Sequence, residues 1–229
     1  MTRMTRMTRM TPTSRPPRTS ASRPTPFSPP RRLRFDGWIA GLGTASGTRL
    51  VLGHWPRSPF GAFGDVMVAR PDGHRVLLAP RADVAEFVAT TYRFDEVRLV
   101  PVDVVREGPA WTVTAGPLRL RLRAGGRTPL GALLRSVPPG LAVRPGWARL
   151  TDLPARLLPG VRTYGTAGNG RREWYAARDL WGLAAAGARW DGEDLGAPGP
   201  LAPPPRFGFA QTPRRPCLVR VVSTVELPA

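Results

Sequence analysis

The densest group of polar and aromatic side chains in this 229-residue chain lies in residues 168–179, which read GNGRREWYAARD. If a strand follows the Asn-Gly turn, Arg171, Glu173, Tyr175 and Ala177 share one of its faces. Glu173 and Tyr175 would then offer a carboxylate and a phenol to an acid, amide or carbonyl compound inside the protein. The alternative is an Arg–Glu ion pair beside packed aromatic rings. The candidate ligand-binding residues of this segment are Arg171, Arg178 and Asp179.

A second candidate site joins His54, at the end of one predicted strand, to Asp65, at the start of the next. A histidine close to a carboxylate at the mouth of a barrel can act as a general base. The alternative is a structural corner, in which Trp55 and Phe60 pack and His54 hydrogen-bonds to the backbone. One histidine and one aspartate specify no reaction by themselves.

Several kinds of chemistry are excluded by composition. All 34 basic residues are arginine, so there is no lysine for a Schiff base or for a Walker A motif. Cys217 is the only cysteine, and with His54 and His74 as the only histidines it cannot build a Cys/His zinc site. A single cysteine also fits a reducing cytosol, which predicts a cytoplasmic protein. We expect no cofactor and no metal.

The formal net charge of +18 is divided between a short arm and the rest of the chain. Nine arginines and no acid lie in residues 1–34, from Arg3 to Arg34, which are otherwise rich in Pro, Ser and Thr. With little apolar surface to bury, this arm is predicted to be disordered. It is a solvated tail, an arm that binds nucleic acid or a membrane surface, or a targeting segment. Its repeat MTRMTRMTRM leaves the true start open among Met1, Met4, Met7 and Met10.

Residues 35–229 form a single predicted domain with no apolar stretch long enough to span a membrane. Strands are predicted, from alternation and from turn residues such as Pro71-Asp72-Gly73, over 38–40, 48–52, 65–68, 75–78, 97–105, 111–113, 118–123, 161–166, 171–183 and 217–227. Amphipathic helices are predicted over 83–92 and 129–137, the second with Leu130, Leu133 and Leu134 on one side. Pro101 marks an edge or a bulge in its strand.

These elements predict a mostly β (α+β) fold: an antiparallel β-barrel or closed sheet with two or three short helices. Within it, residues 118–123 alternate leucine and arginine, so Arg119, Arg121 and Arg123 share a face. Aromatic residues between them would favour single-stranded nucleic acid, but the interleaved residues are leucines, which favours a solvated face.

The chain resembles a family of proteins from high-GC bacteria to which no activity is assigned. The resemblance covers about residues 35–227 and rests on the segments FDGWIAGLGTASGTRLVLGHWPRSPFGAFGDVMV, EFVATTYRFDEVRLVPV, LPGVRTYGTAGNGRREWYAARDL and FGFAQTPRRPCLVRV. More remotely, the layout is similar to acetoacetate decarboxylase-like barrels. That resemblance implies a β-rich cone with a polar interior, but the Schiff-base lysine of the decarboxylases is missing. What it leaves is a small-molecule pocket lined by groups such as Glu173 or Arg178.

Three functions follow as hypotheses. The first is a small-molecule-binding barrel for a polar or acidic ligand, which could be an enzyme that works without lysine. The second is a nucleic-acid-associated protein that uses its arginines. The third is a structural or partner-binding module. The oligomeric state does not follow from the sequence.

Overall fold

The computed structural model describes residues 31–138, 140, 164–166, 170–205, 207–208 and 213–227. Residues 1–30 of the predicted arm lie outside the described residues. Strand β1 begins at Arg32, so the predicted boundary at residue 34 falls inside a strand. In the described part of the chain, neither helix combines the length and apolar character needed to cross a bilayer.

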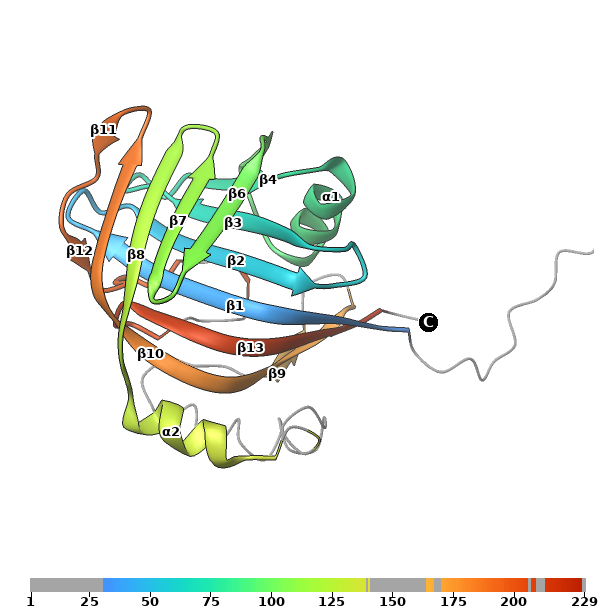
Figure 1. The fold of residues 1–229 in the computed structure, drawn as a ribbon. Coiled ribbons are helices and arrows are strands. Elements are labelled where there is room, and N and C mark those ends of the chain that lie inside the picture. The colour runs from blue at the N-terminus through green and yellow to red at the C-terminus, as the bar shows by residue number, and fades with distance from the viewer. Residues whose placement is uncertain are drawn as a thin grey trace, which may run out of the picture.

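The described strands belong to one sheet, which dominates the molecule (Figure 1). Its strands are β1 (Arg32–Thr44), β2 (Arg49–Arg57), β3 (Phe63–Ala69), β4 (Arg75–Ala79), β5 (Glu96–Leu99), β6 (Val102–Glu107), β7 (Ala110–Ala115), β8 (Leu118–Arg127), β9 (Tyr164–Thr166), β10 (Arg172–Trp190), β11 (Glu193–Asp194), β12 (Pro198–Gly199) and β13 (Cys217–Glu226). Ten of them follow the order β5-β4-β3-β2-β1-β13-β10-β8-β7-β6. Pairing along this path is antiparallel except between β4 and β5.

The ten-strand path curls, and its two end strands, β5 and β6, are consecutive in the chain with only two residues between them. β5 ends at Leu99 and β6 begins at Val102. The single strand predicted over 97–105 is therefore wrong, because Val100 and Pro101 carry the chain from one edge of the sheet to the other. Proline lacks the N–H that a ladder needs, which suits it to this crossing. The predicted fold class, mostly β with a curled sheet and short helices, is confirmed.

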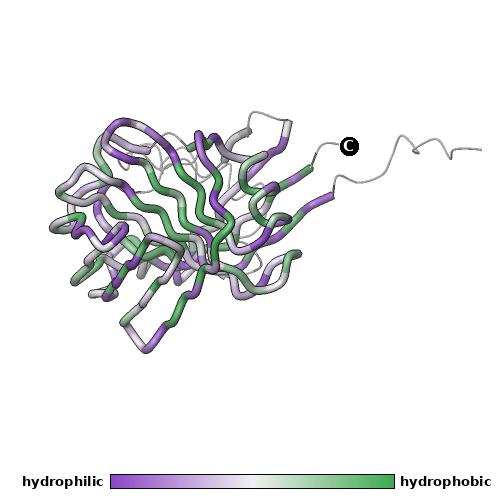
Figure 2. The backbone as a smooth tube through the Cα atoms, turned by 90° about the horizontal axis from the view of Figure 1, so that it is seen from above, coloured by the Kyte–Doolittle hydropathy of each residue, from purple (hydrophilic) through white to green (hydrophobic). Residues whose placement is uncertain are grey.

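Hydrophobic residues are spread along the strands of the sheet (Figure 2). Because side chains alternate between its faces, the buried ones form two separate cores. Inside the curl, leucines such as Leu50 and Leu52 on β2 pack with Leu120 and Trp111 from the opposite half of the sheet. The other face of β1–β4 and β13 packs against helix α1 (Ala82–Thr91), where Trp55 joins a second cluster. The interior of the curl is thus filled with side chains, and the second face is the one that a helix covers.

The second helix, α2 (Pro129–Ser136), lies beside β10. The Thr128 hydroxyl accepts a hydrogen bond from the Gly131 backbone N–H at 3.0 Å and caps its N-terminus. Both predicted helices are confirmed within one residue. The predicted side of α2 is partly wrong: Leu133 is 65% exposed, whereas Leu130 and Leu134 turn toward the protein.

The long strand β10 connects the two halves of the sheet, because it pairs with β13 along its first part and with β8 along its second. It extends to Trp190, seven residues past the predicted end at 183. A register shift between Ala177 and Asp179 marks a bulge within its pairing with β13, which continues to Gly182, while pairing with β8 begins at Trp181.

Candidate functional site

A cavity of about 190 Å³ lies on the face of the sheet that α1 covers. Its floor consists of side chains from β1, β2, β3, β10 and β13, and α1, α2 and residues 205, 207 and 213 supply its walls. Most of the lining is apolar and aromatic. The polar groups are few and belong to two carboxyl residues and their neighbours, which is the usual composition of a small-molecule pocket.

The first carboxyl residue is Glu173, which is 2% exposed on β10. The Tyr92 hydroxyl lies 2.8 and 2.9 Å from its two oxygens, and the Ser223 hydroxyl donates to Oε1 at 3.0 Å. The Tyr92 and Tyr175 hydroxyls are also hydrogen-bonded to each other. Glu173 and Tyr175 therefore lie in the cavity together, as the alternation of their strand predicted.

Burial dominates the electrostatics of this group. It raises the pKa of Glu173, while hydrogen bonds from Tyr175, Tyr92 and Ser223 oppose the shift. Burial, followed by the nearby Glu173 charge, also raises the pKa of Tyr92 and of Tyr175 well above their ordinary range. Both phenols consequently keep their protons and act as hydrogen-bond donors.

The second carboxyl residue is Asp65 on β3, also 2% exposed. Its Oδ1 accepts a hydrogen bond from Trp55 Nε1 at 3.0 Å, and its Oδ2 accepts none from the described residues. Burial raises the pKa of Asp65 to about 7, because the Trp55 hydrogen bond offsets only part of the desolvation. Asp65 also contributes to the raised pKa of Tyr92, which brings the two carboxyl residues into one electrostatic group.

Space for the Asp65–Trp55 bond depends on the residue opposite Asp65, which is Gly53. A Cβ at that position would lie 2.4 Å from Asp65 Oδ1 and 2.6 Å from Trp55 Nε1. Any larger side chain at 53 must displace this pair, so the glycine is needed for a close approach of side chains.

The predicted pairing of His54 with Asp65 is not present. Asp65 is directly opposite Gly53, one residue before His54, and a one-residue step places a side chain on the other face of the sheet. The His54 ring packs edge-on against Trp111 inside the curl, with ring centroids 5.5 Å apart. Burial and the Arg106 charge lower the pKa of His54, and its buried Nδ1 has no hydrogen-bond partner among the described residues.

The three candidate ligand-binding residues lie outside the described lining of the cavity. Arg171 donates to the Thr90 and Thr91 hydroxyls at 2.8 Å and holds the end of α1. Both carboxylate oxygens of Asp179 accept a hydrogen bond from Arg127 Nε, each at 3.0 Å. The buried Nε of Arg178 lacks a hydrogen-bond partner among the described residues.

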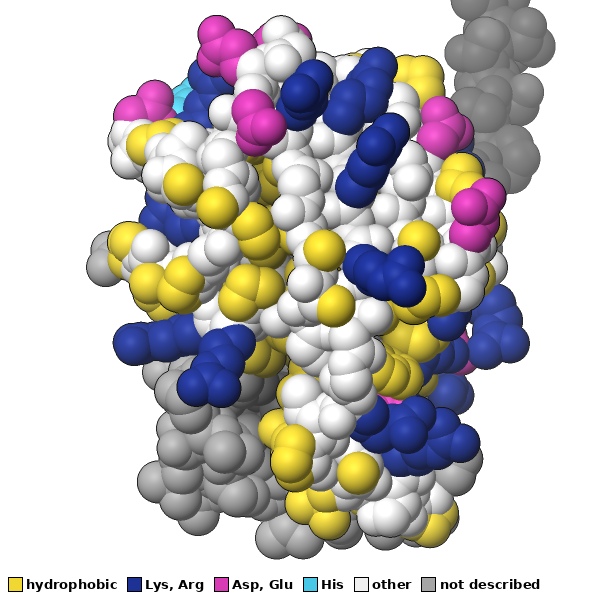
Figure 3. Space-filling model, turned by 60° about the vertical axis from the view of Figure 1, so that its left-hand side comes forward, with side chains coloured by type: hydrophobic (Ala, Val, Ile, Leu, Met, Phe, Trp, Pro, Cys, Tyr) yellow, Lys and Arg dark blue, Asp and Glu magenta, His cyan; other side chains and the backbone are white. Residues whose placement is uncertain are grey.

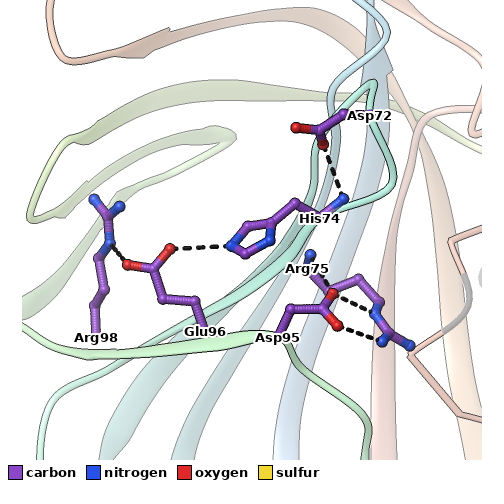
Figure 4. Close-up of polar contacts among 6 residues, drawn as sticks. All are labelled: Asp72, His74, Arg75, Asp95, Glu96 and Arg98. Carbon is purple, nitrogen blue, oxygen red and sulfur yellow. Dashed lines mark hydrogen bonds and ion pairs between the residues drawn. The ribbon is translucent and has the colours of Figure 1, made fainter.

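A second polar cluster lies at the edge of the sheet, where β4 and β5 begin (Figure 4). Arg75 holds Asp95 through two bonds of 2.7 and 2.9 Å. Glu96 lies between Arg98, at 2.5 Å, and the His74 ring, at 3.2 Å. Asp95 and Glu96 each have basic partners, whereas Asp72 accepts a bond from the His74 backbone N–H at the turn. The cluster joins β5 to β4 at the surface, and its ion-paired carboxylates differ from the buried Asp65.

Trp55, Tyr92 and Ser223 belong to the site and were not predicted from the sequence. Ser223 did leave a signal: it shares a strand face with Val219, Val221 and Val225, all of which line the cavity. Asp65 has the same signature between Phe63 and Met67. A polar residue in the apolar register of a strand marks such a position. Tyr92 follows a helix, and no local pattern indicates its partner 81 residues away.

Scans against protein-family models and against curated protein sequences gave no match. Among solved structures, acetoacetate decarboxylase from Legionella pneumophila is similar, with 11% identity, a TM-score of 0.39 and 90% of each chain covered. Another structure of acetoacetate decarboxylase is 8% identical, with a TM-score of 0.36, and covers 86% of this chain and 84% of its own. These neighbours agree with the remote resemblance noted from the sequence, and no residue role is carried over from them.

Proposed function

We propose that the protein binds a small, largely apolar organic molecule with one polar end in the cavity beneath α1. The observation that supports this is an apolar cavity of about 190 Å³ lined by a buried carboxyl residue, Asp65, whose Oδ2 accepts no hydrogen bond from the described residues. An apolar cavity of about 150 Å³ already accommodates benzene. The ligand is therefore about the size of a substituted benzene ring.

The polar groups of the lining indicate the charge of the ligand's polar end. The sequence suggested a polar or acidic compound held by Arg171 or Arg178, but neither is among the described lining residues. Two buried carboxyl residues, Asp65 and Glu173, line the cavity instead, and a ligand carboxylate beside them would be repelled. A neutral or cationic polar end fits this lining better than an acidic one.

Lysine-independent catalysis remains compatible with this proposal. Asp65 is the candidate general acid or base, because burial brings its pKa to about 7, close to the pH at which it would work. Tyr92 and Tyr175 supply hydroxyl donors in the same cavity. Binding is the part of the proposal that the cavity supports directly, and catalysis is a further step.

Two leucines on α2 provide a matched test. Leu134 lines the cavity and Leu133, one residue before it, is exposed. We expect benzyl alcohol to bind the wild type and Leu133→Trp equally in isothermal titration calorimetry. Leu134→Trp should weaken binding by about tenfold or more, because the indole fills the cavity. Equal affinities for both variants, or no binding to the wild type, would contradict the proposal.

A second candidate function, nucleic-acid binding, is favoured by one surface feature. Arg119, Arg121 and Arg123 are exposed along one face of β8, as predicted, and Arg189 of β10 is the direct partner of Arg119. Basic side chains are spread over the face of the molecule seen in Figure 3. Like charges opposite each other destabilise a sheet, and an anionic partner would remove that cost. A polyanion such as nucleic acid is the fitting partner, with the arm arginines from Arg3 to Arg34 as additional contacts.

The full-length chain can test this second function by fluorescence anisotropy with a labelled oligonucleotide over a series of salt concentrations. Replacing Arg121 and Arg123 by Gln should weaken binding and flatten its salt dependence. The matched control replaces Arg3 and Arg6 of the arm by Gln. If only the arm variant loses affinity, the β8 surface has no part in binding.

A further inference from the structure

We propose that the ligand of this cavity carries a protonated amine, which pairs with Asp65, attached to a small aromatic or aliphatic body. This inference rests on the proposed function, since it names the polar end of the molecule that the cavity would hold. The interaction is a charge-assisted hydrogen bond from the ammonium group to Asp65 Oδ2, and no covalent step is involved.

Asp65 has too few hydrogen-bond partners within the described part of the protein. A buried carboxylate is costly unless it is paired, and here its single hydrogen bond comes from the neutral Trp55 indole at 3.0 Å. Asp65 lines the cavity, and its Oδ2 receives no bond from the described residues. A ligand group in the cavity can supply this missing partner.

The described lining of the cavity contains no cationic side chain. The titratable groups that face the cavity with Asp65 are Tyr92, which follows α1, and Glu173 and Tyr175 of β10, and all of them are acids. The parts of β1, β2, β13 and α2 that line it, and residues 205, 207 and 213, contribute no charged side chain. In a chain with 34 arginines, the described wall of this one cavity is free of them. Since no described lining residue is a cation, we assign the positive partner of Asp65 to the ligand.

Asp65 and Glu173 differ in how many of their carboxyl oxygens are hydrogen-bonded within the protein. Glu173 already receives hydroxyl bonds from Tyr92 and Ser223, at 2.8 to 3.0 Å, so its oxygens have partners within the protein. When Glu173 is ionised, it adds negative potential nearby, which favours a cation over a neutral group. Asp65 is left as the direct acceptor.

The rest of the cavity fits the body of such a molecule. Phe35, Phe63 and Phe87 line it, with the Phe35 ring 5.1 Å from that of Phe87 and 6.3 Å from that of Phe63. Aromatic faces attract an ammonium group as well as an apolar ring. An aryl- or alkylammonium ion of roughly benzylamine size thus matches both the wall and the volume.

The test compares three probes of nearly equal size in calorimetry: benzylamine, benzyl alcohol and benzoate. At about pH 8 we expect the wild type to bind benzylamine about tenfold more tightly than benzyl alcohol, and benzoate most weakly. Asp65→Asn should abolish the preference for the amine, so that the variant binds benzylamine and benzyl alcohol with similar affinities. Asp95→Asn, which removes a carboxylate outside the cavity, should behave as the wild type.

A second measurement needs no variant, in case Asp65→Asn does not fold. Lowering the pH from about 8 to about 6 protonates Asp65, so the ratio of amine to alcohol affinity should fall several-fold in the wild type. Equal binding of amine and alcohol in the wild type would overturn the inference and leave the proposed function intact. An amine preference that persists in Asp65→Asn would overturn the role of Asp65. Failure of all three probes would overturn the proposed function itself.

Discussion

Two carboxyl groups in this sheet, on β3 and just before β5, have pKa values shifted in opposite directions. Asp65, on β3 inside the cavity, has its pKa raised to about 7 by burial. Asp95, at the start of β5, has its pKa held well below the usual range by two bonds from Arg75 and by the Arg75 backbone N–H. The edge cluster pairs Asp95 and Glu96 with basic side chains at exposed or half-buried positions, whereas Asp65 is buried and has no cation among the described lining residues.

This contrast separates a structural charge from a functional one. Surface ion pairs such as Arg75–Asp95 satisfy themselves and need nothing further from solution. A buried carboxyl group without a cation reduces the stability of the fold, and proteins retain such groups mainly where they perform a task. By that criterion Asp65, and not the more conspicuous cluster around His74, is the group to test first.

The largest expected effect is on stability as a function of pH, in Asp65→Asn. Below the ordinary pKa of 3.8 the group is protonated in both states, and between 3.8 and about 7 only the unfolded chain releases its proton. Asp65 therefore lowers the free energy of unfolding as pH rises through this window, by about 4 kcal/mol at most, and the effect levels off above it. Asp65→Asn should remove this loss in urea unfolding measured from about pH 4 to about pH 8.

The sign of this pH dependence of stability distinguishes the buried Asp65 from the surface carboxylate Asp95. Wild type and Asp65→Asn should have nearly equal stability at the acid end and diverge toward neutral pH, with the variant the more stable. Parallel curves for the two proteins would show that Asp65 is hydrated in the native state, and the cavity would lose its special carboxyl group.

The sequence was sufficient wherever a single strand decides the outcome. The Leu–Arg alternation of β8 predicted its buried and exposed faces, and alternation along β10 placed Glu173 and Tyr175 on one face. The Pro-Asp-Gly turn between β3 and β4 was predicted because glycine readily adopts the positive φ that such a turn needs. In the structure Gly73 has a φ of +90°. In each case the determining interactions lie within a few residues of one another.

The sequence was insufficient where two distant elements decide the outcome. His54 and Asp65 were paired in the prediction because they are close in the chain, but the register of β2 on β3 places them on opposite faces. Register depends on the whole hairpin, and a shift of one residue reverses every side chain. Tyr92 and Glu173 meet across 81 residues, which depends on how α1 docks on the sheet.

A second, smaller effect is expected from Tyr92→Phe, which removes the donor that reaches both oxygens of Glu173. The loss of a buried hydrogen bond to a charged group costs about 1–3 kcal/mol. Because Glu173 already has a raised pKa, the loss should grow as pH rises and more of the carboxyl groups ionise. Ser223→Ala, which removes one donor to one oxygen, is the matched control and should cost less. A cost independent of pH would mean that Tyr92 stabilises the fold by packing alone.

The smallest effect is expected at the edge cluster, from Asp95→Asn. This carboxylate has a lowered pKa, so its contribution to stability is present at neutral pH and is lost as pH falls below its ordinary value of 3.8. Its side chain is 38% exposed, and solvent screens the pair with Arg75, so we expect only a slight fall in melting temperature at neutral pH and low salt. Added salt should reduce the difference further. A large, salt-insensitive loss would show that the edge cluster holds β5 in place, and the distinction between a self-satisfied surface pair and an energetically important buried group would no longer hold.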